Sequence, residues 1–258
     1  MRLMKRILSA AAALALSASL LVGCSSGTAS SVPVSASSAA ESTVSSVEET
    51  ASSAVDENEA AAAQLLNDLT GSYRELWPVI LADEYKQTWL DDCTALVGED
   101  NAEAAFEKLS SMVTGDVYGE DAVKAYANGG GAYFCGFTNS LATLTFDGET
   151  STISGTDKDG NVLFSHTYHY IGMEPVHGLY EFESDDADSG EFTYFFLAPD
   201  TSAETYHIEF RYGSDAEALS QYDAGEYAYW VASGISTDCD QTMIDNCIEL
   251  FCTENLAG

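Results

Sequence analysis

Six cysteines are the most reactive side chains of this 258-residue chain. Cys24 ends an apolar run, and the other five lie far downstream, at Cys93, Cys135, Cys239, Cys247 and Cys252. None belongs to a C-x-x-C pair, so a thiolate zinc knuckle is not indicated. The odd downstream number leaves at least one thiol unpaired, while an oxidising compartment would allow one or two disulfides. Cys247 and Cys252 lie five positions apart in a predicted helix, so they point in different directions and are not expected to pair.

The sequence carries none of the common catalytic or phosphate-binding motifs. Neither G-x-S-x-G nor H-E-x-x-H occurs. Gly129-Gly130-Gly131 leads into a predicted strand rather than a helix, so it cannot present a helix N-terminus to phosphate. Asp157-Lys158-Asp159-Gly160 has the D-x-D-G pattern of a calcium loop but lacks the Glu that closes an EF-hand, so we expect a hairpin turn there. We therefore predict that the protein is not an enzyme.

Residues 1–24 are typical of a lipoprotein signal peptide. Met1–Arg6 is positively charged, Ile7–Val22 is apolar, and Leu21–Cys24 resembles the lipobox in which the cysteine is diacylated and becomes the mature N-terminus. The apolar run is short for a membrane span, which argues against the alternative of an uncleaved anchor helix. We expect lipidation at Cys24 and an extracytoplasmic, lipid-anchored location at the cell membrane or envelope.

Composition divides the remaining chain into a tether and a domain. Residues 25–60 are rich in Ser, Ala and Glu and hold no aromatic residue, which predicts a disordered acidic tether. Residues 61–258 hold the aromatic residues of a folded core. The formal net charge is −33, from 42 acidic and 9 basic residues. Such a surface is repelled by phosphate backbones, so nucleic acid is excluded as a partner.

The first part of the domain has helical periodicity. Leu65, Leu66 and Leu69 share one helix face, and a second stripe runs from Tyr73 to Leu81, with Pro78 predicting a kink or a restart. A further amphipathic helix covers Ala105–Val113 and ends before Gly115.

From Tyr133 the period of the apolar residues becomes two. Expected strands, separated by turn signals, cover 133–137, 141–146, 162–171, 179–182, 192–197 and 206–212. Tyr227–Val231 is a last strand or an aromatic loop, and Ser236 or Thr237 is expected to cap a terminal helix. The fold class is therefore α+β: an up-and-down antiparallel β-barrel with N-terminal helices and a C-terminal helix.

Three stretches in order resemble the zinc-binding ZinT (YodA-like) family. Leu69–Pro78 resembles its opening W-x-G-x-W-x-S-V-Y-P. Gly190–Tyr194 with Leu197–Pro199, followed by Thr205–Ile208, resembles G-x-F-K-Y-V-Q-F-S-D-H-x-I-A-P and then H-F-H-[IL]. Tyr227–Val231 stands where the family has W-P-T-Y-Y. The resemblance implies a calycin-like (lipocalin-related) barrel over the whole domain. It also implies a role like that of the zinc-capturing lipoproteins that serve cation ABC importers.

The resemblance also implies a zinc site, but only part of its ligand pattern is present. The family's histidine in S-D-H has no counterpart, and Thr205 replaces the first histidine of H-F-H, so that only His207 aligns with a family ligand. Glu209 shares a strand face with His207 and is a candidate oxygen ligand. We expect His207 to face the barrel interior.

The other histidines are candidates for completing that site. They are His166, His169 and His177, of which His166 and His169 would lie on opposite faces of one strand. The alternative is that these histidines hydrogen-bond the many tyrosines of the sheet. Three functions follow. One is a lipoprotein that binds zinc or another divalent cation and assists its uptake. The second is a calycin-type binding or interaction module that has lost the metal site, and the third is a structural or antigenic surface domain.

Overall fold

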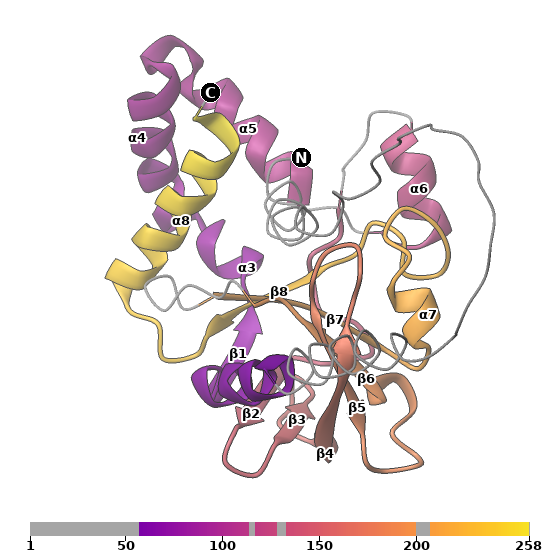
Figure 1. Cartoon of the computed structure of the whole chain (residues 1–258). Helices are drawn as coiled ribbons and strands as arrows, with labels where there is room; N and C mark the ends of the chain where they lie inside the picture. The colour runs from indigo at the N-terminus through magenta and orange to yellow at the C-terminus, as the bar shows by residue number, and fades with distance from the viewer. Residues whose placement is uncertain (1–56, 114–116, 128–132, 200–206, 258) are drawn as a thin grey trace, which may run out of the picture.

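Eight strands form a closed barrel in the computed structural model, which describes residues 57–113, 117–127, 133–199 and 207–257. Each strand pairs antiparallel with the next one along the chain, and the last returns to the first (Figure 1). The predicted calycin-like antiparallel barrel with flanking helices is thereby confirmed. The strands are β1 (Gly71–Glu75), β2 (Thr143–Asp147), β3 (Thr152–Thr156), β4 (Val162–Met173), β5 (Tyr180–Ser184), β6 (Tyr194–Leu197), β7 (His207–Gly213) and β8 (Ala232–Ser236).

Helices pack around the outside of the barrel. A helix at 57–68 precedes β1. The others are α3 (Trp77–Ile80), α4 (Lys86–Val97), α5 (Glu99–Val113), α6 (Glu120–Ala127), α7 (Ala216–Leu219) and α8 (Gln241–Leu256), with short 3₁₀ turns η1 (Asp83–Tyr85) and η2 (Gly190–Phe192). In Figure 1, α4, α5 and α8 stand together on one side, and α6 and α7 lie on the other. Within the described ranges, no helix is long and apolar enough to cross a membrane.

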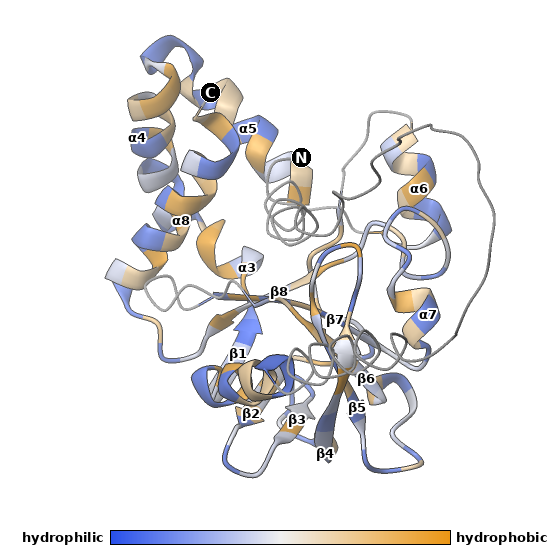
Figure 2. Ribbon diagram, in the orientation of Figure 1, coloured by the Kyte–Doolittle hydropathy of each residue, from blue (hydrophilic) through white to orange (hydrophobic). Residues whose placement is uncertain are grey.

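The buried residues form two hydrophobic cores, and the helix at 57–68 and α7 belong to the barrel core. Aromatic rings fill the barrel interior, among them Phe164, Phe195, Phe210 and Tyr212. The second core joins α3, α4, α5 and α8 to the barrel wall, where Ile235 of β8 takes part in it. Hydrophobic and hydrophilic residues alternate along α4 and α8, as expected of helices with one buried face (Figure 2). The C-terminal helix therefore packs mainly against α4, and its core reaches the barrel wall at Ile235.

The prediction of one helical stripe from Tyr73 to Leu81 is wrong in its first half. Gly71–Glu75 is strand β1, which pairs with both β2 and β8 and so closes the barrel. Helical structure begins only at Trp77, with Pro78 in the first turn, where proline is tolerated. Tyr73 is buried in the barrel core rather than against a neighbouring helix. Pairing with two distant strands overrides the local periodicity.

Two other element predictions need correction. The expected strand at 133–137 is irregular and makes only an isolated bridge, Phe134 with Trp230. The terminal helix is capped by neither Ser236 nor Thr237; its N-cap is Asp240, whose carboxylate accepts a hydrogen bond from the Met243 backbone N–H at 3.0 Å. The last strand is Ala232–Ser236, which directly follows the aromatic segment Tyr227–Val231. These shifts place α8 a few residues later than expected.

Candidate functional site

Strand β7 carries the two candidate ligands, His207 and Glu209. Successive side chains on a strand point to opposite faces, and Ile208, Phe210 and Tyr212 belong to the barrel core. His207 pairs in register with Ile235, which faces the helices. His207 and Glu209 thus share a face, as predicted, but that face is the outside of the barrel. The expectation that His207 points into the interior is wrong, because the apolar residues of β7 occupy that side.

A small cleft lies between this outer face and the helices. His207 and Glu209 line it together with residues of α8 and of the segment around α3, namely Leu76, Trp77, Ile80, Cys247, Leu250, Phe251 and Glu254. The cleft is partly open, and its volume of about 20 Å³ has room for about one water molecule. An imidazole, two carboxylates and a thiol therefore line this cleft, although no three of them converge as a metal-binding group.

Helix α8 supplies the far wall of the cleft. Cys247, Phe251 and Glu254 lie four and then three positions apart, so they project from one face of the helix. The sequence pattern predicts that Cys247 lies in the terminal helix but does not single out Glu254. The seven-residue spacing between Cys247 and Glu254 was the signal that could have identified it.

The Cys247 thiol is protonated in this setting. Burial, and then the charges of Glu209, Cys239 and Glu254, raise the pKa of Cys247 to about 12. A thiol of this kind is a poor ligand until a cation enters, because a bound metal ion favours the thiolate strongly. Glu209 also raises the pKa of Cys135, although burial is the larger cause. The carboxylates of Glu209 and Glu254 therefore lie close enough to Cys247 to raise its pKa.

The donors around the cleft do not form a complete metal centre. Over the described part of the chain, no group of three or more His, Cys, Asp and Glu side chains is close enough to hold a metal ion. A zinc site needs a converging tetrahedral set of ligands. His207 and Glu209 have suitable chemistry and share one wall of the cleft, but further donors would have to approach them. The residues present therefore fit a zinc ion only in part.

The histidines of β4 do not join this cleft. They lie on opposite faces of the strand, as predicted, and each pairs with an aspartate beyond the end of β5. His166 Nδ1 lies 2.7 Å from Asp186 Oδ2, and its ring stacks near Phe164. His169 Nδ1 lies 2.8 Å from Asp185 Oδ1 on the exposed side. Their polar contacts are thus with carboxylates rather than with the tyrosines that the alternative interpretation named.

His177 belongs to a separate buried cluster in the β4–β5 turn. Its backbone N–H donates to Glu174 Oε2 at 2.5 Å, and its Nδ1 lies 3.3 Å from the same oxygen. The imidazole contacts the Tyr222 ring at 3.6 Å between centroids, and the Arg211 guanidinium lies 4.1 Å from that ring. Burial raises the pKa of Glu174, but hydrogen bonds from His177 and Val176 outweigh it, and the net pKa lies below its usual range. The polar contacts of His177 are therefore with Glu174 of its own turn and not with the cleft on β7.

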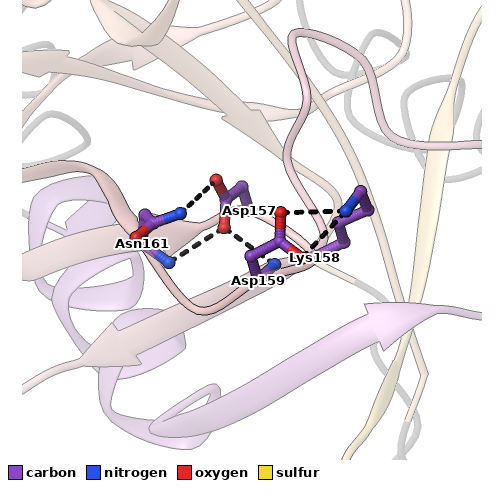
Figure 3. Close-up of polar contacts among 4 residues, drawn as sticks. All are labelled: Asp157, Lys158, Asp159 and Asn161. Carbon is purple, nitrogen blue, oxygen red and sulfur yellow. Dashed lines mark hydrogen bonds and ion pairs between the residues drawn. The ribbon is translucent and has the colours of Figure 1, made fainter.

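The Asp157–Gly160 turn has its carboxylate already engaged. Asp157 Oδ1 accepts hydrogen bonds from the backbone N–H groups of Asp159 and Asn161, and Oδ2 accepts one from the Asn161 side chain (Figure 3). The Asn161 side chain, then its backbone, lowers the pKa of Asp157. The segment is the hairpin turn between β3 and β4 that the sequence predicted, and it shows no calcium-loop geometry.

Comparison with known proteins gives structural matches only. No family model and no curated protein matches the chain. One similar solved structure is the Zn(II)-bound ZinT-like domain of Streptococcus pneumoniae AdcA, at 15% identity and a TM-score of 0.45, covering 71% of this chain and 89% of the other. The matched domain of AdcA is the one described as ZinT-like. Zn(II)-bound AdcA itself matches at 14% identity and a TM-score of 0.42, over 72% of this chain and 35% of AdcA.

Several sequence predictions concern residues outside the described ranges. The signal peptide, lipidation at Cys24 and almost all of the tether fall within 1–56. Thr205, which replaces a family histidine, lies in the segment 200–206 just before β7. The helix at 57–68 begins inside the range 25–60 assigned to the tether. These assignments remain predictions from the sequence.

Proposed function

We propose that this chain is an extracytoplasmic lipoprotein of ZinT type that binds a divalent cation, with zinc as the first candidate, and assists its uptake. The observation that carries the proposal is that His207, the residue aligned with a family ligand, lies beside Glu209 in a small cleft. The anionic groups around that cleft favour a cation over any other small ligand. Zinc prefers imidazole nitrogen with carboxylate or thiolate donors, which are the groups present.

The proposed binding mode requires α8 to move toward β7. His207 and Glu209 would hold the ion from the strand side, while Glu254 and Cys247 would complete its surroundings from the helix. A cation would also lower the pKa of the Cys247 thiol from the value that burial gives it. Cys24 would be diacylated and would keep the domain at the membrane surface, near a cation ABC importer.

Calorimetric titration with zinc tests this proposal. The full-length chain carrying Cys24→Ser, which removes an interfering thiol, is titrated in detergent alongside a His207→Ala version. We expect saturable heat in the parent and at least a tenfold weaker affinity in His207→Ala, since even groups that only support a ligand are worth about 10–100-fold in affinity. His169→Ala is the matched control, because this imidazole is exposed and pairs with Asp185 elsewhere. Equal affinity in the parent and His207→Ala would reject the site.

A second function is a binding or interaction module that no longer holds a metal. The observation in its favour is that the described residues contain no group of three metal donors. The same titration separates the two functions: absence of zinc-dependent heat in the parent chain, together with an unchanged circular dichroism spectrum, would favour the metal-free module.

A further inference from the structure

Two buried cysteines meet between α4 and α8. The Sγ atoms of Cys93 and Cys252 are 4.0 Å apart, and neither residue has exposed surface. All five cysteines in the described ranges are free thiols. Cys135, Cys239 and Cys247 have no comparable sulfur–sulfur contact among the bonds of the described residues. The 93–252 pair is therefore the one placed for covalent chemistry.

The surrounding packing holds the two backbones close together. Trp89, one turn before Cys93, packs edge-on against Phe251, the neighbour of Cys252, with 5.7 Å between ring centroids. The Trp89 indole also donates to the Ile80 carbonyl at 2.7 Å, which fixes α4 against α3. A disulfide has a sulfur–sulfur bond of about 2.05 Å. The sulfurs must therefore approach by about 2 Å, a distance that side-chain rotation covers when the helices already touch.

We propose that Cys93 and Cys252 form a disulfide that ties α4 to α8 when the chain folds in the presence of a disulfide oxidant. One thiolate attacks the oxidant disulfide RSSR, forms a mixed disulfide and releases one RSH after proton uptake. The second thiolate then displaces the remaining RS group, which leaves as another RSH. Overall, two cysteine thiols and RSSR give one protein disulfide and two RSH. The physiological occurrence of this bond rests on the extracytoplasmic location proposed above; the chemistry itself does not.

Burial determines when the bond can form. Thiol exchange requires the thiolate and an open approach for the oxidant, and both sulfurs are enclosed in the helical core. The disulfide must therefore form during folding, before α8 packs over α4. Once formed, the disulfide is shielded from soluble reductants by the same packing. It also anchors the helix that carries Cys247 and Glu254, so that it sets how far the cleft wall can move.

Refolding in a glutathione redox buffer tests the proposal. The full-length Cys24→Ser chain is unfolded, reduced and refolded with oxidised and reduced glutathione; free thiols are then alkylated, and peptides are mapped without reduction by mass spectrometry. We expect a linked peptide joining Cys93 to Cys252, whereas Cys135 is alkylated. Oxidised glutathione added to the already folded, reduced protein should form the bond far more slowly. Recovery of Cys93 and Cys252 as free thiols, or a Cys239–Cys247 link in their place, would overturn the proposal.

Thermal unfolding provides the second readout. The oxidised chain should unfold at a higher temperature than the reduced chain, and this difference should disappear in Cys93→Ser but persist in Cys135→Ser, a matched buried cysteine. Equal midpoints in the oxidised and reduced parent chain would count against the cross-link. Because peptide mapping is done on the parent chain, poor folding of a variant does not remove the test. Zinc titration of the reduced protein reports on the proposed function separately.

Discussion

Arg211 is a fully buried cation on the outer face of β7. Its guanidinium donates to the backbone carbonyls of Leu219 and Tyr227, and it stacks over the Tyr222 ring. Burial lowers the pKa of Arg211, an effect opposed by Tyr222 and Glu174. A desolvated charge is tolerated only when its hydrogen bonds are supplied. Arg211 thus holds the loop after α7 against the barrel wall by hydrogen bonds. The turn that contains Glu174 lies on the other side of Arg211.

Replacing Arg211 by Met should therefore be severely destabilising. Arg211→Met keeps much of the side-chain volume but leaves two buried carbonyls unpaired and removes a positive charge near Glu174. We expect the free energy of unfolding to fall by about 3–5 kcal/mol, measured by urea denaturation. Arg74→Met, at an exposed arginine of β1, is the control and should change stability by less than about 0.5 kcal/mol. Similar losses for the two variants would mean that the buried network contributes nothing particular.

At the residue scale the sequence predicted which side chains share a face but not which side of the sheet they occupy. The period of two is enough to group His207 with Glu209. The outward direction was also present in the sequence, since Ile208, Phe210 and Tyr212 form the apolar half of the same strand. Because the apolar half of a strand faces the core, that pattern places His207 and Glu209 on the outside. No sequence pattern predicts that Arg211 is buried, because its burial depends on the loop that follows α7 and folds back over it.

Among the secondary-structure elements, the stability of α8 matters most for the cleft, because α8 forms one of its walls. Its first turn is held by Asp240, which accepts from the Met243 backbone N–H. Asp240→Ala should lower the free energy of unfolding by about 1 kcal/mol, the usual contribution of an N-cap. Thr237→Ala should have an effect below about 0.5 kcal/mol, because Thr237 is exposed and lies before the cap. Chemical denaturation measures the free energy of unfolding of both variants. A larger loss in Thr237→Ala than in Asp240→Ala would mean that Thr237 is the N-cap, as the sequence predicted.

Elements with many apolar residues could be predicted, and those defined by distant pairing could not. Strands β4, β6 and β7 alternate clearly and lie close to their expected positions. β3 was overlooked because its residues, Thr152–Thr156, are mostly small and polar. β1 was assigned to a helix because Tyr73, Leu76 and Trp77 fit a helical spacing. Its strand conformation is imposed by neighbours about 70 and 160 residues away in the chain.

On the scale of the whole molecule, net charge determines how thermal stability responds to salt concentration. With 42 acidic and 9 basic residues, the folded chain concentrates negative charge that the unfolded chain spreads apart. Raising NaCl from about 0.01 M to 0.15 M shortens the screening length from about 30 Å to 8 Å. We expect the thermal unfolding midpoint to rise over this range, measured by circular dichroism. Sucrose at matched osmolality controls for solvent effects, and a midpoint that is flat or falls with NaCl would show that self-repulsion is negligible.

The pairing of β1 with β8 has a consequence for biosynthesis. A ribosome makes residues 71–75 long before residues 232–236, so the first strand has no second neighbour until about 160 further residues have been made. Contacts between segments so distant in the chain slow folding, and an open sheet exposes two unpaired edges meanwhile. The nascent chain must consequently be kept from pairing with other copies until its final strand emerges. A chain truncated before β8 would keep these sheet edges unpaired permanently.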